Sequence, residues 1–163
     1  ILEDIDFFVE FRDQIKIFSK VLGPSGSIYR VKAIRQVGGF DENIKGVGED
    51  IDAEYKIKMN GWLLFITPAI FYEKRRRLWR EVWSEYFWHG YGLHYIFHKN
   101  REVITYYKIL DYTVMFKKIK RSLIAYKLVY RKIAFLLPLY WIFKRTAWLF
   151  GFIKAHLDGY GHS

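Results

Sequence analysis

The sequence predicts an α/β fold followed by a basic helical tail, and three observations lead to this prediction. Residues 49–59 have a helical spacing of apolar side chains and end at Asn60-Gly61. An apolar, aromatic run at residues 62–73 then has the composition of a buried strand. A second helical pattern follows this run, and the order helix, strand, helix is typical of an α/β domain.

The composition indicates one ordinary domain, or a large piece of one. The chain has 163 residues, of which 52% are hydrophobic and 20% are aromatic, enough for a packed core. It contains no cysteine, which excludes structural disulfides and thiolate metal sites and is consistent with a reducing compartment. Because the first residue is Ile1 rather than methionine, we expect the C-terminal portion of a longer protein.

The charge is divided unevenly along the chain. Residues 1–60 carry 9 Lys and Arg against 11 Asp and Glu, whereas residues 61–163 carry 18 against 6. The second part therefore produces a positive field, which favours a polyanionic partner. Nucleic acid, anionic lipid and a phosphorylated substrate all meet this description, and charge alone does not choose among them.

The first elements are predicted in the following order. Apolar spacing predicts a helix within residues 1–22, and glycine, proline and serine predict a loop at 23–27. Residues 28–37 are expected to form a short strand that leads into a helical turn, which Gly38-Gly39 breaks. Turn-forming residues then predict a surface loop at 41–48.

The later elements follow from the same signals. After the helix at 49–59, the strand predicted at 62–73 bends at Pro68. Residues 74–98 begin with Lys74-Arg75-Arg76-Arg77 and continue as a helix rich in tryptophan and tyrosine. This helix completes the predicted α/β domain, to which we assign residues 1–103.

Residues 104–163 differ in kind and are predicted to form a basic amphipathic helical tail. Two apolar runs, 133–143 and 146–153, are each shorter than the ~20 residues that cross a bilayer. Lys144-Arg145 and Pro138 interrupt the combined stretch. A segment that lies in the membrane interface is the preferred interpretation. The alternative is a pair of core helices packed on the rest of the domain.

Six carboxylates are concentrated in residues 38–62 of this basic chain. They are Asp41, Glu42, Glu49, Asp50, Asp52 and Glu54. Carboxylates in the first turn of a helix are stabilised by the free N–H groups and the helix dipole, by roughly 0.3–1 kcal/mol each. The cluster is therefore explained either as a helix cap or as a catalytic pocket.

The order of motifs around this cluster resembles a known enzyme family. Gly-Gly-Phe-Asp-Glu at 38–42 is followed by a short loop, Glu-Asp-Ile-Asp at 49–52, an amphipathic helix and Gly61-Trp62, with Ser27–Arg30 upstream. This set, over about residues 23–95, is similar to the acceptor-side half of family 2 glycosyltransferases. The resemblance implies the C-terminal portion of a GT-A, Rossmann-like domain, and it suggests that the cluster is both cap and site.

The resemblance also implies roles for the individual carboxylates. Asp50 is expected to be the general base, which removes a proton from the acceptor hydroxyl as that hydroxyl attacks the sugar. Its basicity would be tuned by opposing influences, since Glu49 and Asp52 disfavour its ionisation and the helix N-terminus favours it. We assign Glu49 and Asp52 to acceptor binding or support of the pocket. Asp41 is expected to be a turn residue.

Basic and aromatic side chains after the predicted strand are further candidates. The resemblance implies that Arg75, Arg76 and Arg77 contact the donor diphosphate, for which an arginine fork is suited. The alternatives are a solvated basic edge or a membrane contact. Trp79 is a candidate for stacking on a sugar, although core packing is the commoner outcome. No metal ligand is assigned, and His94 is expected to be structural.

The implied enzyme requires parts that lie outside this region. In the family, a nucleotide-binding half precedes it and holds Mg²⁺ or Mn²⁺ through an Asp-x-Asp motif. Asp4-Ile5-Asp6 has these letters without the preceding buried strand, and we treat the match as coincidence. The chain is therefore expected to contain the base and the acceptor pocket, and to be inactive alone.

These expectations define a function and a rival. The function is an inverting glycosyltransferase that moves a sugar from a nucleotide-sugar donor to a glycan or lipid-linked acceptor, for cell-envelope polysaccharide or glycolipid synthesis. Such an enzyme would be cytoplasmic and peripheral on the inner face of the cell membrane, with no nucleic acid bound. The rival is a non-enzymatic basic module that binds nucleic acid or an anionic membrane.

Overall fold

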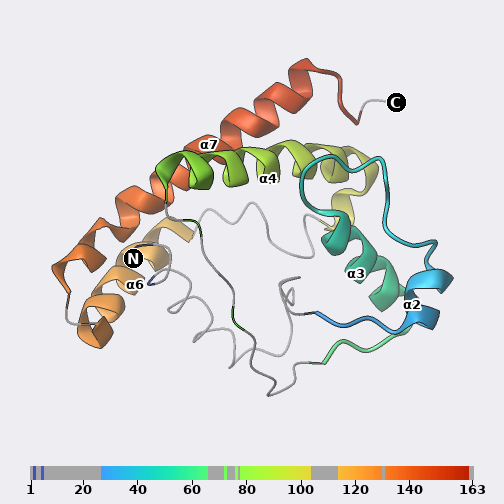
Figure 1. The fold of residues 1–163 in the computed structure, drawn as a ribbon, viewed down its shortest axis with the longest axis horizontal. Coiled ribbons are helices and arrows are strands. Elements are labelled where there is room, and N and C mark those ends of the chain that lie inside the picture. Colours follow the sequence, from blue (N-terminus) through green and yellow to red (C-terminus); the bar gives the residue numbers. More distant parts are fainter. Residues whose placement is uncertain are drawn as a thin grey trace.

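The structure is a computed structural model, and every regular element among the residues it describes is a helix. It describes Leu2, Ile5, Tyr72, Arg76 and residues 27–65, 78–103, 114–129 and 131–161, except for the side chains of 114–119 and 129. The elements are α2 (Val31–Gln36), α3 (Glu49–Met59), α4 (Trp79–Lys99), α6 (Val114–Val129), the 3₁₀ helix η1 (Lys132–Leu136) and α7 (Leu137–Leu157). Figure 1 shows their arrangement.

The predicted α/β, Rossmann-like GT-A fold is therefore wrong. Residues 27–30 precede α2 without forming the expected strand, and the helical turn expected after them is present as α2. Trp62–Phe65 follow α3 without pairing into a strand, and the rest of the run at 66–71 lies outside the described residues. Strand propensity reflects packing within a sheet, so an apolar run forms a strand only where a partner strand is available.

The long helices α4 and α7 lie side by side, and two glycines allow their close approach (Figure 1). A Cβ added at Gly90 of α4 would overlap the carbonyl oxygen of Trp148. A Cβ added at Gly151 of α7 would overlap the carbonyl oxygen of Phe87. The two backbones are therefore in contact at this crossing, which requires residues without side chains.

Helix α7 is apolar on two faces. One stripe is buried and comprises Leu137, Tyr140, Lys144, Ala147, Trp148, Gly151 and Ala155. Another stripe is exposed and comprises Leu139, Ile142, Leu149, Phe150, Ile153 and Leu157. Among the described residues, Lys132–Leu157 is the one stretch long and apolar enough to cross a membrane, a test that core helices also pass. Pro138 stands in its first turn, where a missing N–H costs nothing.

Helix α3 has the limits that the sequence predicts. It begins at Glu49 after Gly48, and Asn60 caps its C-terminus. The N–H of Gly61 bonds to the carbonyl of Lys58, and the N–H of Trp62 bonds to that of Ile57, a Schellman ending that requires the positive φ of Gly61.

A hydrophobic cluster holds α3 against the pair of long helices. It consists of Tyr55, Leu93, Ile96, Val103 and Trp148. The loop before α3 lies directly on α4, since a Cβ at Gly92 would overlap the carbonyl of Val47. A second cluster, which includes Ala125, Ala134 and Leu137, joins α6 and η1 to the start of α7. The first cluster and the contact of Val47 with Gly92 fix the N-terminus of α3 relative to α4.

Candidate functional site

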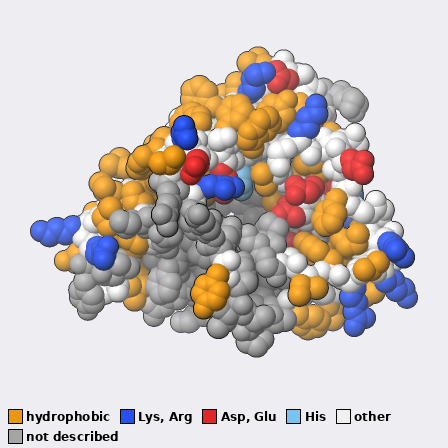
Figure 2. All heavy atoms as spheres, viewed as in Figure 1, with side chains coloured by type: hydrophobic (Ala, Val, Ile, Leu, Met, Phe, Trp, Pro, Cys, Tyr) orange, Lys and Arg blue, Asp and Glu red, His pale blue; other side chains and the backbone are white. Residues whose placement is uncertain are grey.

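The acidic cluster lies at the start of α3, where three of its carboxylates, Asp50, Asp52 and Glu54, are buried. Asp50 is 8% exposed and Asp52 is 1% exposed. Figure 2 shows that this face of the molecule is hollowed near its centre, with acidic side chains on the side of the hollow where α3 lies. Gly48, which precedes the helix, packs against Ile96 of α4. The cluster is thus both a helix start and part of a concave surface.

Asp52 forms a network of ion pairs. Its Oδ2 atom lies 2.6 Å from Nζ of Lys56 and 2.9 Å from Nζ of Lys99. Lys99 also bonds to Oδ2 of Asp41 at 2.5 Å, so one ammonium group joins α4, α3 and the preceding loop. Burial favours the neutral form of Lys99, but its carboxylate partners outweigh this and raise its pKa. Asp52 is therefore held by two ammonium groups, and its assignment to acceptor binding or support of a pocket stays a prediction.

Asp41 is the turn residue that the sequence predicts. Its Oδ1 atom accepts hydrogen bonds from the backbone N–H of Asn43 at 2.9 Å and from Nδ2 of the same residue at 3.0 Å. Burial favours the neutral acid, but the bonds from Lys99 and Asn43 are stronger together and lower the pKa of Asp41 to about 2. This prediction is confirmed.

Asp50 has a different environment, although it is only two residues from Asp52. Its Oδ1 atom accepts the N–H of Ile51 at 2.7 Å, and within the described part of the chain no cation pairs with it. Burial raises the pKa of Asp50, and the charge of Glu49 raises it further, while the bond from Ile51 opposes both. A buried carboxylate with a raised pKa and no counter-charge has the properties of a general base.

Two more side chains belong to this acidic surface. Glu49 is half-buried and accepts the N–H of Gly48 through Oε2 at 3.0 Å. Glu54, one turn after Asp50, is 4% exposed. Burial raises the pKa of the Tyr29 phenol, and the nearby charges of Glu54 and Asp50 raise it further. Tyr29 therefore places a hydroxyl group beside the carboxylates of α3.

The described basic and aromatic candidates, Arg76 and Trp79, have their contacts on α4 and α7. Nε of Arg76 is 3.2 Å from Oε2 of Glu85 on α4, and the side chain of Arg76 is 60% exposed. Arg75 and Arg77 lie outside the described residues. Trp79 makes edge contacts with Tyr140 and Phe143 of α7, at centroid distances of 5.5 and 4.9 Å.

Trp79 is far from the acidic cluster along α4. It is the first residue of the helix, whereas Ile96, which contacts the loop before Asp50, lies 17 residues later, about 25 Å along the axis. The structure therefore does not bring Trp79 together with Asp50. Its aromatic contacts place it in the α4–α7 interface.

The acidic cluster does not fit a Mg²⁺ or Mn²⁺ site. Such ions require several free carboxylate or carbonyl oxygens. Asp41 and Asp52 share the ammonium group of Lys99, and Asp50 and Glu49 each accept a backbone N–H. No step of the chemistry proposed below passes through a metal ion bound here.

Sequence reasoning placed Glu54 in the acidic cluster without a role, and it did not connect Tyr29 or Lys99 with the carboxylates of α3. Glu54 had a usable signal, because its spacing of four residues from Asp50 places both on one face of α3. Tyr29 and Lys99 had none, because each meets α3 only through tertiary contacts. A group of histidines, His94, His98 and His156, was also missed and is discussed below.

Comparisons with protein-family models, with curated protein sequences and with solved structures gave no match. A functional proposal for this chain therefore depends on the geometry of the acidic cluster and on the order of its motifs.

Proposed function

We propose that this chain supplies the acceptor side of an inverting glycosyltransferase of the family 2 type, with Asp50 as the general base. The observation that carries the proposal is the contrast between Asp50 and Asp52. Asp52 is held in ion pairs, whereas Asp50 is buried, has a raised pKa and has no cation beside it among the described residues. If Asp50 served only as a helix cap, it would need neither to be buried nor to lack a cation beside it among the described residues.

The reaction needs one base and a leaving diphosphate. The acceptor hydroxyl attacks the anomeric carbon of the nucleotide sugar, and its proton passes to a carboxylate oxygen of Asp50. The new C–O bond forms as the bond to the diphosphate breaks, and the diphosphate leaves with the electron pair. Because attack and departure occur on opposite sides of the carbon, the anomeric configuration is inverted.

The other carboxylates hold this base in place. Asp52 and Lys99 fasten the first turn of α3 to the end of α4, which limits movement of Asp50 relative to the pocket. Glu49 lies beside Asp50 and is only half-buried, so it is positioned to accept a hydrogen bond from an acceptor hydroxyl, whereas Glu54, later in the sequence of α3, is buried. Tyr29 offers a hydroxyl group on the same surface.

We further propose that the enzyme works at the cytoplasmic face of the cell membrane, on a lipid-linked or envelope glycan acceptor. The support is the apolar stripe of α7, in which six large hydrophobic side chains are exposed, since contiguous exposed apolar patches mark protein or membrane contacts. Arg131, Lys132 and Lys154 are exposed along the same segment and would attract anionic lipid.

The donor is assigned to another part of the enzyme. The family resemblance places the nucleotide sugar and its Mg²⁺ or Mn²⁺ in a half that precedes this region, which agrees with the poor fit of the ion to the acidic cluster. The test therefore uses the full-length protein with Mn²⁺ present.

The decisive experiment compares two substitutions of neighbouring acids. Asp50→Asn keeps the shape of the side chain but removes the base, and we expect transfer to fall by at least about 10²-fold. Glu42→Gln is the matched control, since Glu42 is exposed and has no proposed role. The assay measures release of nucleoside diphosphate from uridine and guanosine diphosphate sugars in the presence of a membrane lipid extract.

Two results would contradict the proposal. Activity of Asp50→Asn equal to that of Glu42→Gln would show that Asp50 is not the base. Absence of transfer in the unsubstituted protein, together with salt-sensitive binding of RNA or single-stranded DNA, would favour the rival binding module.

A further inference from the structure

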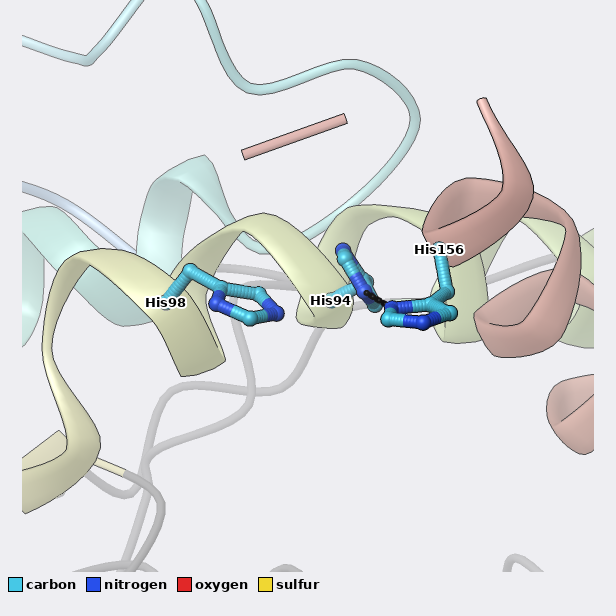
Figure 3. A group of neighbouring side chains, drawn as sticks. All are labelled: His94, His98 and His156. Carbon is cyan, nitrogen blue, oxygen red and sulfur yellow. Dashed lines mark hydrogen bonds between the residues drawn. The ribbon is translucent and has the colours of Figure 1, made fainter. Parts of the chain in front are cut away.

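Three histidines from two helices converge at the C-terminal end of the α4–α7 pair. His94 and His98 are one turn apart on α4, and His156 is on the last turn of α7 (Figure 3). The spacing of four residues places the first two on one face of α4. Figure 3 shows the three rings directed toward a common space between the two helices.

The distances between ring nitrogens suit a single metal ion. Each histidine offers one nitrogen, and these atoms lie within 4.8 Å of one another. Nε2 of His94 is 3.4 Å from Nδ1 of His156. Two nitrogens bound to one tetrahedral Zn²⁺ at 2.0–2.1 Å are about 3.3 Å apart. The nitrogens of His94 and His156 already have the required separation. A small rotation of the His98 ring would bring its nitrogen to a similar distance from the other two.

A second hydrogen bond fixes the form of His94 that can bind a metal. Nδ1 of His94 lies 2.6 Å from the carbonyl oxygen of Tyr160. A carbonyl oxygen only accepts, so Nδ1 carries the proton and donates it. Nε2 then carries the lone pair of the ring and presents it to Nδ1 of His156, 3.4 Å away. Metal-binding histidines almost always have such an outer hydrogen bond, which orients the ring and sets the tautomer.

The three rings differ in burial, so the site they form is open to solvent on one side, at His156. His94 is fully buried, His98 is half-buried and His156 is exposed. An ion can therefore enter from the side of His156, and a water molecule can complete the coordination. Neutral imidazole nitrogens are ligands for Zn²⁺ and related transition metals, whereas Mg²⁺ and Mn²⁺ prefer oxygen. We propose that His94, His98 and His156 form a zinc site.

The position of this site connects it to the acidic cluster. The residue that accepts from His94, Tyr160, also donates its hydroxyl to the carbonyl of Asn43 at 2.8 Å. The same hydroxyl accepts the N–H of Lys45. A bound ion would therefore fasten the end of α7 and the following turn to α4, and through Tyr160 it would steady the loop that leads into α3.

The test measures binding of Zn²⁺ to the full chain without a histidine tag, by titration calorimetry and by the shift in unfolding temperature. We expect one ion per chain at micromolar or lower Kd, a raised unfolding temperature, and no response to Mg²⁺. His98→Gln and His156→Gln should each weaken binding at least tenfold. These two positions are chosen because neither ring is fully buried, so both variants are expected to fold.

His89→Gln is the matched control. His89 is on α4 as well, but it stacks on Tyr86 and is outside the group. The proposal is overturned if the unsubstituted chain does not bind Zn²⁺, or if His89→Gln weakens binding as much as His98→Gln and His156→Gln do. The readout is binding of the ion itself, so it is independent of sugar transfer.

Discussion

Asp50 and Asp52 show how one helical turn can hold two carboxylates in different environments. Asp52 lies beside two ammonium groups, which stabilise its charge in a site that is almost fully buried. Asp50 has no cation beside it among the described residues, and burial and the charge of Glu49 raise its pKa. The first arrangement stabilises the fold, whereas the second costs stability and suits the proposed role of Asp50 as a proton acceptor.

This contrast predicts that the same substitution, aspartate to asparagine, has different effects on stability at positions 52 and 50. Asp52→Asn removes charge-assisted bonds to Lys56 and Lys99, and we expect the free energy of unfolding at pH 7 to fall by about 2 kcal/mol. Asp50→Asn removes an unfavourable buried charge, so we expect the free energy of unfolding to be unchanged or higher. Urea denaturation of both variants checks this, and a loss of stability in Asp50→Asn would show that its charge has a stabilising partner.

The pH dependence of transfer gives a second prediction about Asp50. The proposed transfer needs the ionised carboxylate of Asp50. Because the pKa of Asp50 is raised, kcat/KM should begin to fall, as the pH is lowered, at a higher pH than the ordinary pKa of 3.8 would give. Glu49→Gln removes a charge that raises this pKa, so the acid limb should move to lower pH. An unchanged limb in this variant would assign the titration to another group.

The ion pair of Asp41 should persist throughout that pH profile. Because the folded pKa of Asp41 is lowered to about 2, its contribution to stability is complete above its unfolded value near 3.8. The contribution is lost only as the pH falls through about 2. Loss of activity above pH 4 therefore reports on the base and not on this contact.

Among the elements, the pair α4 and α7 organises the described part of the molecule. Their crossing depends on Gly90 and Gly151, whose missing side chains allow each backbone to reach a carbonyl of the other helix. Lys144 is buried at the same interface and lies over the rings of Tyr86 and Tyr140, at 4.5 and 4.9 Å from their centroids. The cation that interrupts the apolar run in the sequence is thus accommodated by aromatic faces.

The glycines at this crossing give a prediction for the element scale. Gly151→Ala should lower the free energy of unfolding by about 1–3 kcal/mol, because the new methyl group overlaps the carbonyl of Phe87 and the helices must separate. Ser84→Ala is the control, since Ser84 is exposed on α4 and alanine favours the helix. Thermal denaturation compares the two, and equal stability would mean that the helices cross farther apart.

The whole molecule combines a positive charge with an apolar helix that is not fully covered. Helix α7 uses one stripe to pack on α4 and exposes another, of which Leu139 is 64% exposed and Leu157 is 76% exposed. A helix that is apolar on both faces normally has a partner on each. The two apolar runs lie in η1 and a single long helix, α7, rather than in the pair of core helices that the sequence offered as an alternative. One face of α7 packs on α4, and contact of the exposed face with lipid stays a prediction.

Vesicle binding tests that prediction. Substitution of both Leu139 and Ile153 by serine should reduce sedimentation with vesicles of anionic phospholipid severalfold, because it removes apolar area from the exposed stripe. Binding of the unsubstituted protein should weaken with added salt. Replacing exposed Ser84 by alanine again serves as the control. Equal binding of the double variant would remove α7 as the membrane contact.

The sequence by itself determined the elements whose signals are local. The start of α3, its Asn60-Gly61 ending and the turn at Asp41 were all predicted, because a cap, a positive φ or a side-chain bond to a neighbouring N–H involves residues a few positions apart. The acid at position 50 could be singled out by its motif. The predicted sheet was wrong because an apolar run does not specify whether a partner strand exists.

Only the tertiary structure decided which of these groups act together. The bond between Lys99 and Asp52 joins residues 47 positions apart, and the one between His94 and His156 joins residues 62 apart. Residues so far apart in the sequence come together through the packing of α3 and α7 on α4. No local sequence pattern can therefore predict these contacts. The physical reason is that a carboxylate's role depends on burial and on its neighbouring charges, and both are properties of the folded chain.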